Sequence, residues 1–181
     1  MNALDAVDIP SLTIVKYPDP RLRMSGETVT EFDERLRALI EKMFELMYRD
    51  NGVGLAAQQV GVPLRLFVTN PTLSEGDERV YINPELIELS GSAEAEEGCL
   101  SFPNLSAPVK RAATATIRAM DLEGNVFEED GEELLARIFQ HETDHTVGRL
   151  LIDRMSPVAK IANRRLLKAM EEQFASSAHG S

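Results

Sequence analysis

The stretch QHETDH, residues 140–145, holds the residue types that catalytic metal sites use. His141 and His145 are four positions apart, so on a helix their side chains lie one above the other on the same face. Glu142 follows the first histidine, as in H-E-x-x-H sites, where two imidazoles bind a metal ion and the glutamate is a general base. Two histidines do not complete such a site, so a third ligand must come from elsewhere in the chain.

Downstream of this stretch, the ligands that metallopeptidases use are poorly represented. HETDHTVG begins the pattern H-E-x-x-H-x-x-G-x-x-H, but the last histidine of that pattern would fall on Leu151, whose apolar side chain cannot bind a metal. A peptidase of the thermolysin type would instead take a carboxylate, and Glu171 or Glu172 has suitable spacing. A zinc-dependent peptidase of the H-E-x-x-H class therefore stays open as the alternative function.

Upstream of the histidines, the single cysteine, Cys99, lies in EEGCLSFP, residues 96–103. A thiolate is a good ligand for soft and borderline metals. One cysteine with two histidines would leave a fourth coordination position open for water, as a catalytic site requires. Most lone cysteines are instead inert buried thiols, so Cys99 alone leaves both interpretations open.

The elements that must position these residues can be read from apolar spacing and turn residues. Helical periodicity predicts helices over about 31–49 and 132–147, and Ser156 before Pro157 is typical of a third helix start. Shorter apolar runs predict strands at 64–70 and 80–83, the second ended by Pro84, and a hairpin from 114.

The acidic segment SGSAEAEEG, residues 90–98, is expected to be a flexible loop. Strands in the middle of the chain and helices at both ends predict an α+β fold. We expect mostly antiparallel strands packed around a central H-E-x-x-H helix, with an N-terminal and a C-terminal helix.

Composition and charge restrict the class of protein. The 181 residues fit one domain, which we place at 1–175, followed by a disordered tail at 176–181. The net charge of −11 argues against DNA binding, because phosphate contacts need Lys and Arg. The sequence has no apolar run of about 18 residues, the length that predicts a membrane span. With one cysteine and no signal peptide, we expect a cytoplasmic protein.

Three segments in order, GVGLAAQQ (52–59), EGCLS (97–101) and QHETDH (140–145), resemble the signature segments of peptide deformylases. Shorter stretches such as YPDPRLR and GRLLIDRMSP are also similar, so the resemblance covers about residues 12–160. It implies an enzyme that removes the formyl group from N-formylmethionyl nascent polypeptides of bacterial or organellar type. It also implies one Fe²⁺ ion held by Cys99, His141 and His145, with Zn²⁺, Ni²⁺ or Co²⁺ able to substitute.

The same resemblance implies a role for each catalytic residue. A metal-bound water would attack the formyl carbonyl, with Glu142 as general base and then acid. The side chain of Gln59 and the backbone N–H of Leu100 would stabilise the oxyanion. The peptide would bind in extended form, like an added strand. The residues assigned to substrate binding are Gly52, Val53, Gly54, Glu97, Gly98, Leu134, Arg137 and Ile138.

Three further side chains near these motifs carry specific expectations. Arg111 matches an arginine that pairs with the corresponding glutamate in the family, so the resemblance predicts an ion pair between Glu97 and Arg111 that fixes the cysteine loop. Arg137 is expected to line the methionine pocket with its aliphatic stem while its guanidinium reaches water. Thr146 stands where the family usually has an apolar residue, and modest local repacking is expected there.

The predicted C-terminal helix carries a basic stripe in an otherwise acidic chain. In some deformylases the C-terminal helix contacts the ribosome, so a transient ribosome contact is a hypothesis here. The alternative is an ordinary solvated face. The residues concerned are Lys160, Arg164, Arg165 and Lys168.

Overall fold

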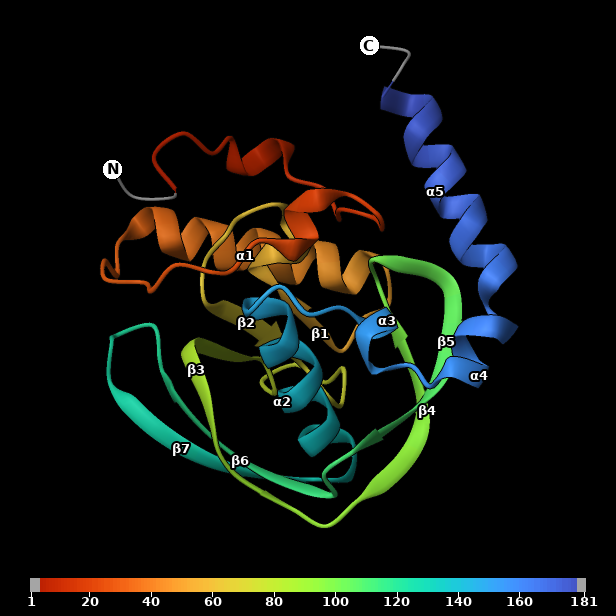
Figure 1. Ribbon diagram of the computed structural model, residues 1–181. Helices are drawn as coiled ribbons and strands as arrows, with labels where there is room; N and C mark the ends of the chain where they lie inside the picture. Colours follow the sequence, from red (N-terminus) through yellow and green to blue (C-terminus); the bar gives the residue numbers. More distant parts are fainter. Residues whose placement is uncertain (1–3, 179–181) are drawn as a thin grey trace.

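Helix α2 (Glu133–Thr146) runs through the middle of the molecule, with the other elements around it (Figure 1). The computed structural model describes residues 4–178. Nine of the fourteen residues of α2 are buried, among them both motif histidines. Ala136 and Phe139 pack on the apolar side chains of the sheet. The helix that carries the motif is therefore a core element, and its ends lie within one residue of the predicted bounds.

A five-stranded antiparallel sheet supports α2, with the strand order β1-β2-β3-β6-β7. The predicted α+β class and the predicted hairpin, which is β6–β7, are confirmed. The strands are β1 (Gly54–Ala56), β2 (Leu66–Thr69), β3 (Arg79–Ser90), β6 (Thr114–Met120) and β7 (Val126–Glu132).

The prediction that the second strand ends at Pro84 is wrong, because β3 continues to Ser90. Its register against β6 shifts between Ile82 and Glu85. Proline has no N–H to give to the ladder, and a local irregularity lets the strand pass it.

A separate two-stranded sheet is formed by β4 (Ala93–Cys99) and β5 (Phe102–Arg111). The prediction of a flexible loop at 90–98 is therefore wrong. Ala93 pairs with Arg111, and the ladder continues to Gly98 opposite Ser106 before the register shifts at Cys99. Small and acidic side chains have weak strand preference, but pairing with the half-buried β5 overrides it. The hairpin brings Cys99 to the end of α2.

The remaining helices pack around this frame. Helix α1 (Glu34–Arg49) begins three residues later than predicted, where the Asp33 side chain accepts a hydrogen bond from the Leu36 N–H. It buries its apolar face in the core that also holds β2. The short helices are η1 (Ile9–Ser11), η2 (Pro20–Arg23), η3 (Ala57–Val60) and α3 (Leu151–Arg154).

The C-terminal segment consists of two helices, α4 (Pro157–Ala162) and α5 (Arg164–Ala178). Ser156 caps α4, as predicted, by accepting a hydrogen bond from the Ala159 N–H. The expected tail is helical as far as Ala178, contrary to the prediction for 176–178, and 179–181 lie outside the described residues. Helix α5 lies along one side of the molecule (Figure 1), with Leu167 and Met170 buried in a core cluster. Within residues 4–178, no helix combines the length and apolarity needed to cross a membrane.

Candidate functional site

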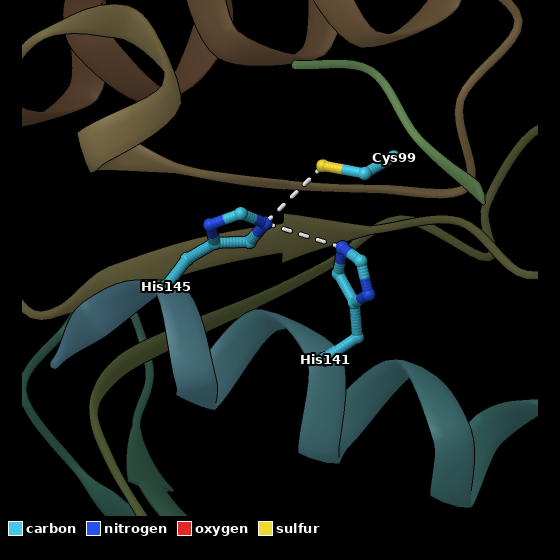
Figure 2. Close-up of side chains that lie close together, drawn as sticks. All are labelled: Cys99, His141 and His145. Atoms are coloured by element: carbon cyan, nitrogen blue, oxygen red, sulfur yellow. Dashed lines mark hydrogen bonds between the residues drawn. The ribbon is translucent and has the colours of Figure 1, made fainter. Parts of the chain in front are cut away.

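Helix α2 and the β4–β5 hairpin bring three possible metal ligands together, as Figure 2 shows. The Nε2 atoms of His141 and His145 are 3.1 Å apart, and the Cys99 Sγ is 3.4 Å from the His145 Nε2. A tetrahedral ion with ordinary bond lengths would hold such nitrogens about 3.3 Å apart and sulfur about 3.5 Å from nitrogen. The three side chains therefore fit one metal ion.

The Glu97 carboxylate orients His141. The His141 Nδ1 lies 2.6 Å from the Glu97 Oε1, so Nδ1 carries a proton and Nε2 is the atom that faces Cys99 and His145. Burial raises the pKa of Glu97, but hydrogen bonds from Arg111 and His141 outweigh it and hold the pKa well below its usual range. Glu97 is therefore an ionised acceptor, as an orienting partner of a ligand must be.

The two histidines differ in their tendency to bind a proton. Burial lowers the pKa of His145, helped by nearby His141, so His145 is neutral and ready to bind metal. Burial also acts to lower the pKa of His141, but its hydrogen bonds with Cys99 and Glu97 outweigh this and raise it. Metal binding would therefore displace a proton from His141.

Two arginines complete the surroundings of Glu97. Arg111 binds it through two nitrogens, at 2.6 and 2.9 Å, which confirms the predicted ion pair. Arg137 adds a third N–H at 2.9 Å. The prediction that its guanidinium reaches water is wrong, because the group also donates to the carbonyls of Val109 and Ala93, and its side chain is 11% exposed. These acceptors on the hairpin outcompete solvent.

Glu142 lies beside the three ligands in a buried position. Burial is the main cause that raises the pKa of Glu142 to about 7. Its Oε2 has no hydrogen-bond partner among residues 4–178. Its Oε1 lies so close to Gly54 that a Cβ there would come within 2.5 Å of it. This carboxyl group can exchange a proton near neutral pH and has one oxygen available to do so.

Gln59 is fixed with its amide N–H pointing into the site. Its Oε1 accepts a hydrogen bond from the Ala56 N–H at 2.9 Å, and its Nε2 therefore faces the Ser101 Oγ at 3.2 Å and the Cys99 Sγ at 3.4 Å. The carbonyl of Leu100, the next residue after Cys99, accepts a hydrogen bond from the Lys16 Nζ at 2.7 Å. The Gln59 amide therefore lies beside Cys99, and Lys16 restrains the residue that follows this cysteine.

A cavity of about 740 Å³ opens onto these groups. Every residue that the sequence assigned to the site lines it, with the exception of His145, which is buried behind His141. Leu134 is 49% exposed and forms part of the mouth, whereas Ile138 is 5% exposed. A Cβ at Gly52 would lie 2.6 Å from the Leu100 side chain, so a larger residue there would displace that side chain.

The carboxylates considered for a peptidase site are engaged elsewhere. Glu171 accepts a hydrogen bond from the Tyr17 hydroxyl at 2.8 Å, and Glu172 pairs with Lys168 on the surface of α5. Leu151 is buried in the core. Cys99 is thus the side chain that joins the histidines in the candidate metal centre.

Sequence reasoning left several residues around the site without a role. Asp144 binds Arg111 at 2.8 Å, and it shares the ligand face of α2 because it follows His141 by three positions. Gln140 holds the backbone of Ala112 through both amide atoms. The helical spacing could have revealed Asp144, whereas Lys16, 84 positions before the carbonyl it binds, gave no local signal.

Thr146 is accommodated within its own helix, and the expected local repacking around it stays a prediction. Its side chain is fully buried, and its hydroxyl donates to the Thr143 carbonyl at 2.8 Å. The polar atom is satisfied within its own helix and does not reach the metal ligands.

Comparisons with known proteins identify the family. The family model described as polypeptide deformylase matches residues 11–160. The chain belongs to the peptide deformylase family. It is therefore an enzyme of a hydrolase family. A peptide deformylase of Acidobacterium capsulatum is 50% identical over 160 residues, 87% of this chain and 94% of that protein.

Solved structures of peptide deformylases have the same fold. The Arabidopsis thaliana peptide deformylase 1B in complex with an inhibitor aligns with a TM-score of 0.88 at 41% identity, over 92% of this chain and 93% of that one. The peptide deformylase of Legionella pneumophila aligns with a TM-score of 0.84 at 43% identity, over 91% and 97% of the two chains. The α+β architecture of this chain is thus that of its family.

Proposed function

We propose that this chain removes the N-terminal formyl group, as formate, from N-formylmethionyl nascent polypeptides. The observation that carries the proposal is the spacing of Cys99, His141 and His145 next to the buried carboxylate of Glu142. The three ligands would hold one divalent ion. When bound, the ion would act as a Lewis acid that makes hydroxide available near neutral pH.

Glu142 is proposed to move the protons of the reaction. Its unpaired Oε2 would accept a proton from the attacking water and then deliver it to the departing amine. A pKa near 7 suits both halves of this task, because the group can lose and regain its proton at working pH. Gly54 leaves the space that this carboxylate occupies, since a Cβ there would lie 2.5 Å from the Glu142 Oε1.

Gln59 and Leu100 are proposed to stabilise the oxyanion that forms on the formyl carbon. The Gln59 amide is already oriented by Ala56 and so need not reorganise during the reaction. The backbone N–H of Leu100 lies on the loop next to Cys99, and the Lys16 contact to the Leu100 carbonyl restrains that loop. Loss of one such donor costs about 100-fold or more in rate.

The cavity supports binding of an extended peptide. Its walls come from the Gly52–Gly54 segment on one side and Gly98 on the other, so a substrate backbone can approach both closely. Val53, Leu134 and Ile138 provide apolar surface for the methionine side chain, and the stem of Arg137 completes that wall. Recognition of backbone suits an enzyme that must accept many nascent chains.

Iron, cytoplasmic location and ribosome contact are proposed on the family resemblance and the charge pattern. Cysteine and histidine ligands suit Fe²⁺ but also Zn²⁺, Co²⁺ and Ni²⁺. The basic residues of the C-terminal helices, Lys160, Arg164, Arg165 and Lys168, are all exposed and available to RNA phosphates. A ribosome pelleting assay with these four residues neutralised tests the contact, and unchanged co-sedimentation would contradict it.

A formate-release assay on N-formylmethionyl peptides tests the proposed reaction. The wild-type chain should release formate, and Glu142→Ala should retain metal but lose at least about 100-fold in rate, the scale of a lost general base. Metal analysis of both proteins separates loss of the proton carrier from loss of the ion. Equal turnover in the two proteins would contradict the assigned role of Glu142, and no formate from either would contradict the function.

A further inference from the structure

A line of alternating charges runs from His141 to the surface of the protein. Glu97 accepts from the His141 Nδ1, and Arg111 holds Glu97. The Arg111 Nη1 then donates to the Asp144 Oδ2 at 2.8 Å. Arg154 closes the line, with its Nε at 2.8 Å from the Asp144 Oδ2 and its Nη2 at 2.5 Å from the Oδ1. Each link is a direct contact between charged or polar side chains.

Exposure changes sharply along this line. The side chains of Glu97, Arg111 and Asp144 are 5%, 4% and 9% exposed, and that of Arg154 is 39% exposed. A buried ion pair is stable only when its remaining hydrogen-bonding positions are satisfied with good geometry. Arg111 needs both carboxylates for this, and the bidentate contact from Arg154 sets the orientation of Asp144.

The members of the line come from four different elements. His141 and Asp144 belong to α2, Glu97 to β4, Arg111 to β5 and Arg154 to α3. Arg154 is absent from the lining of the active-site cavity and instead lines a separate pocket that also includes Lys110 and Gln140. It can affect the metal centre only through the residues between.

We infer that Arg154 is a positioning residue for the metal centre, acting through Asp144, Arg111 and Glu97 on the ring of His141. This inference rests on the proposed metal-dependent function. Removal of Arg154 frees Asp144 to turn, which weakens its hold on Arg111. Glu97 then loses part of the restraint that aims the His141 Nε2 at the ion. Residues that orient a metal ligand typically contribute 10- to 100-fold to metal affinity or activity, and we expect about 10-fold for this outermost member.

The neighbouring residue provides a matched control. Asp153, also in α3, forms a two-pronged ion pair with Arg23, and the Arg23 side chain is 45% exposed, close to the value for Arg154. Among residues 4–178, no hydrogen bond or ion pair joins Arg23 or Asp153 to Glu97 or to the Asp144 carboxylate, and the other acceptor of Arg23 is the Gly148 carbonyl. Arg23→Gln therefore removes a comparable ion pair on the same helix without touching the line of charges.

The experiment is a Co²⁺ titration of the full chain and its variants, followed by the thiolate-to-cobalt absorption band, with melting temperatures measured in parallel. Arg154→Gln should raise the Kd for Co²⁺ about 10-fold and shift the band. Arg154→Lys keeps the charge but loses the bidentate geometry, so its Kd should fall between those of the wild type and Arg154→Gln. Arg23→Gln should bind Co²⁺ like the wild type, whatever its melting temperature.

A second readout follows the first link directly. The proton on the His141 Nδ1 should give a downfield NMR signal because of its 2.6 Å contact with Glu97, and it should move in Arg154→Gln but not in Arg23→Gln. A wild-type chain without the thiolate band would overturn the proposed metal site itself. A wild-type band with Arg154→Gln indistinguishable from Arg23→Gln would overturn the inference alone. If Arg154→Gln does not fold, the Arg154→Lys measurements decide between the same outcomes.

Discussion

The two sides of the candidate metal centre are built by different means. On the helix side, nine of the fourteen residues of α2 are buried, and the two histidine ligands follow from local helix geometry. On the hairpin side, Glu97 is the one buried residue of β4, and the strand otherwise faces water with Cys99 half-buried. The hairpin supplies the thiol ligand nevertheless.

The difference shows what replaces apolar packing when a strand is mostly exposed. An isolated two-stranded hairpin is only marginally stable in water. Here the buried apolar residues of β5 anchor one strand, and the contacts of Glu97 with Arg137 and His141 tie the other strand to α2. Core packing fixes the backbone of α2, whereas charge pairing holds the cysteine hairpin against it and orients the His141 ring. Substitutions on the helix side and on the hairpin side should therefore differ in their effects on stability and on metal affinity.

The largest effect is expected from removal of a ligand on either side. Cys99→Ala and His145→Ala should each lower metal affinity by more than about 100-fold, beyond the range for residues that only orient ligands. His145 is buried in the core, so its loss should also lower the melting temperature, whereas the half-buried Cys99 should not. Metal analysis and thermal unfolding measure both effects. Equal destabilisation by the two variants would contradict the proposed difference between the buried helix side and the exposed hairpin side.

Glycines on the two sides provide the next test. A Cβ at Gly54 would lie 2.5 Å from the Glu142 carboxylate, so Gly54→Ala should displace it and lower kcat by about 100-fold. A Cβ at Gly98 meets nothing closer than the Leu105 carbonyl at 3.7 Å. Gly98→Ala should therefore change KM more than kcat. Steady-state deformylation kinetics distinguish the two, and a normal kcat in Gly54→Ala would contradict the crowding argument.

Glu97→Gln tests whether charge holds the hairpin side. The variant keeps the shape of the side chain but leaves Arg111 with one carboxylate, and breaking a buried pair in this way costs about 3 kcal/mol. Metal affinity should fall by about 10- to 100-fold, because His141 loses its anionic partner. Glu94→Gln, on the exposed part of the same strand, is the control and should change neither quantity. Denaturant unfolding and metal titration provide the measurements.

Arg137 should have a smaller influence, because it is the second guanidinium on Glu97. Arg137→Met keeps the apolar stem in the cavity wall but removes three hydrogen bonds to Glu97, Val109 and Ala93. Hydrogen bonds from a charged group contribute about 1.5–3 kcal/mol. We expect a loss of about 2 kcal/mol in unfolding free energy with metal retained. Loss of metal from this variant would show that Arg111 alone cannot hold the hairpin.

The smallest effect should come from the helix side, at Thr146. Thr146→Val replaces a buried hydroxyl that bonds the Thr143 carbonyl with a methyl group of similar shape. The lost hydrogen bond and the gained apolar contact nearly offset one another, so the change in stability should stay within about 1 kcal/mol. Activity should be unchanged. A marked loss of metal would mean that this hydroxyl supports the ligands through α2.

Much of the helix side could be predicted from local patterns. Spacing alone placed His141 and His145 on one face, and periodicity gave the bounds of α2 within one residue. The hairpin side could not be predicted from local patterns. SGSAEAEEG has the composition of a loop, and it forms a strand only because β5 pairs with it. The continuation of β3 past Pro84 was missed for the same reason. Strand formation depends on a partner that lies elsewhere in the chain.

The sequence by itself indicated the family and the α+β class, because these follow from residue identity, order and short-range spacing. The family resemblance then predicted the candidate ligands and the Glu97–Arg111 pair. Only the tertiary structure decided where Arg137 points, that Asp144 and Arg154 extend the line of charges, and that Glu142 is buried against Gly54. These features depend on burial and on contacts between distant segments. The residue type determines the charge of a side chain, whereas the packing of the folded chain determines which groups that side chain contacts.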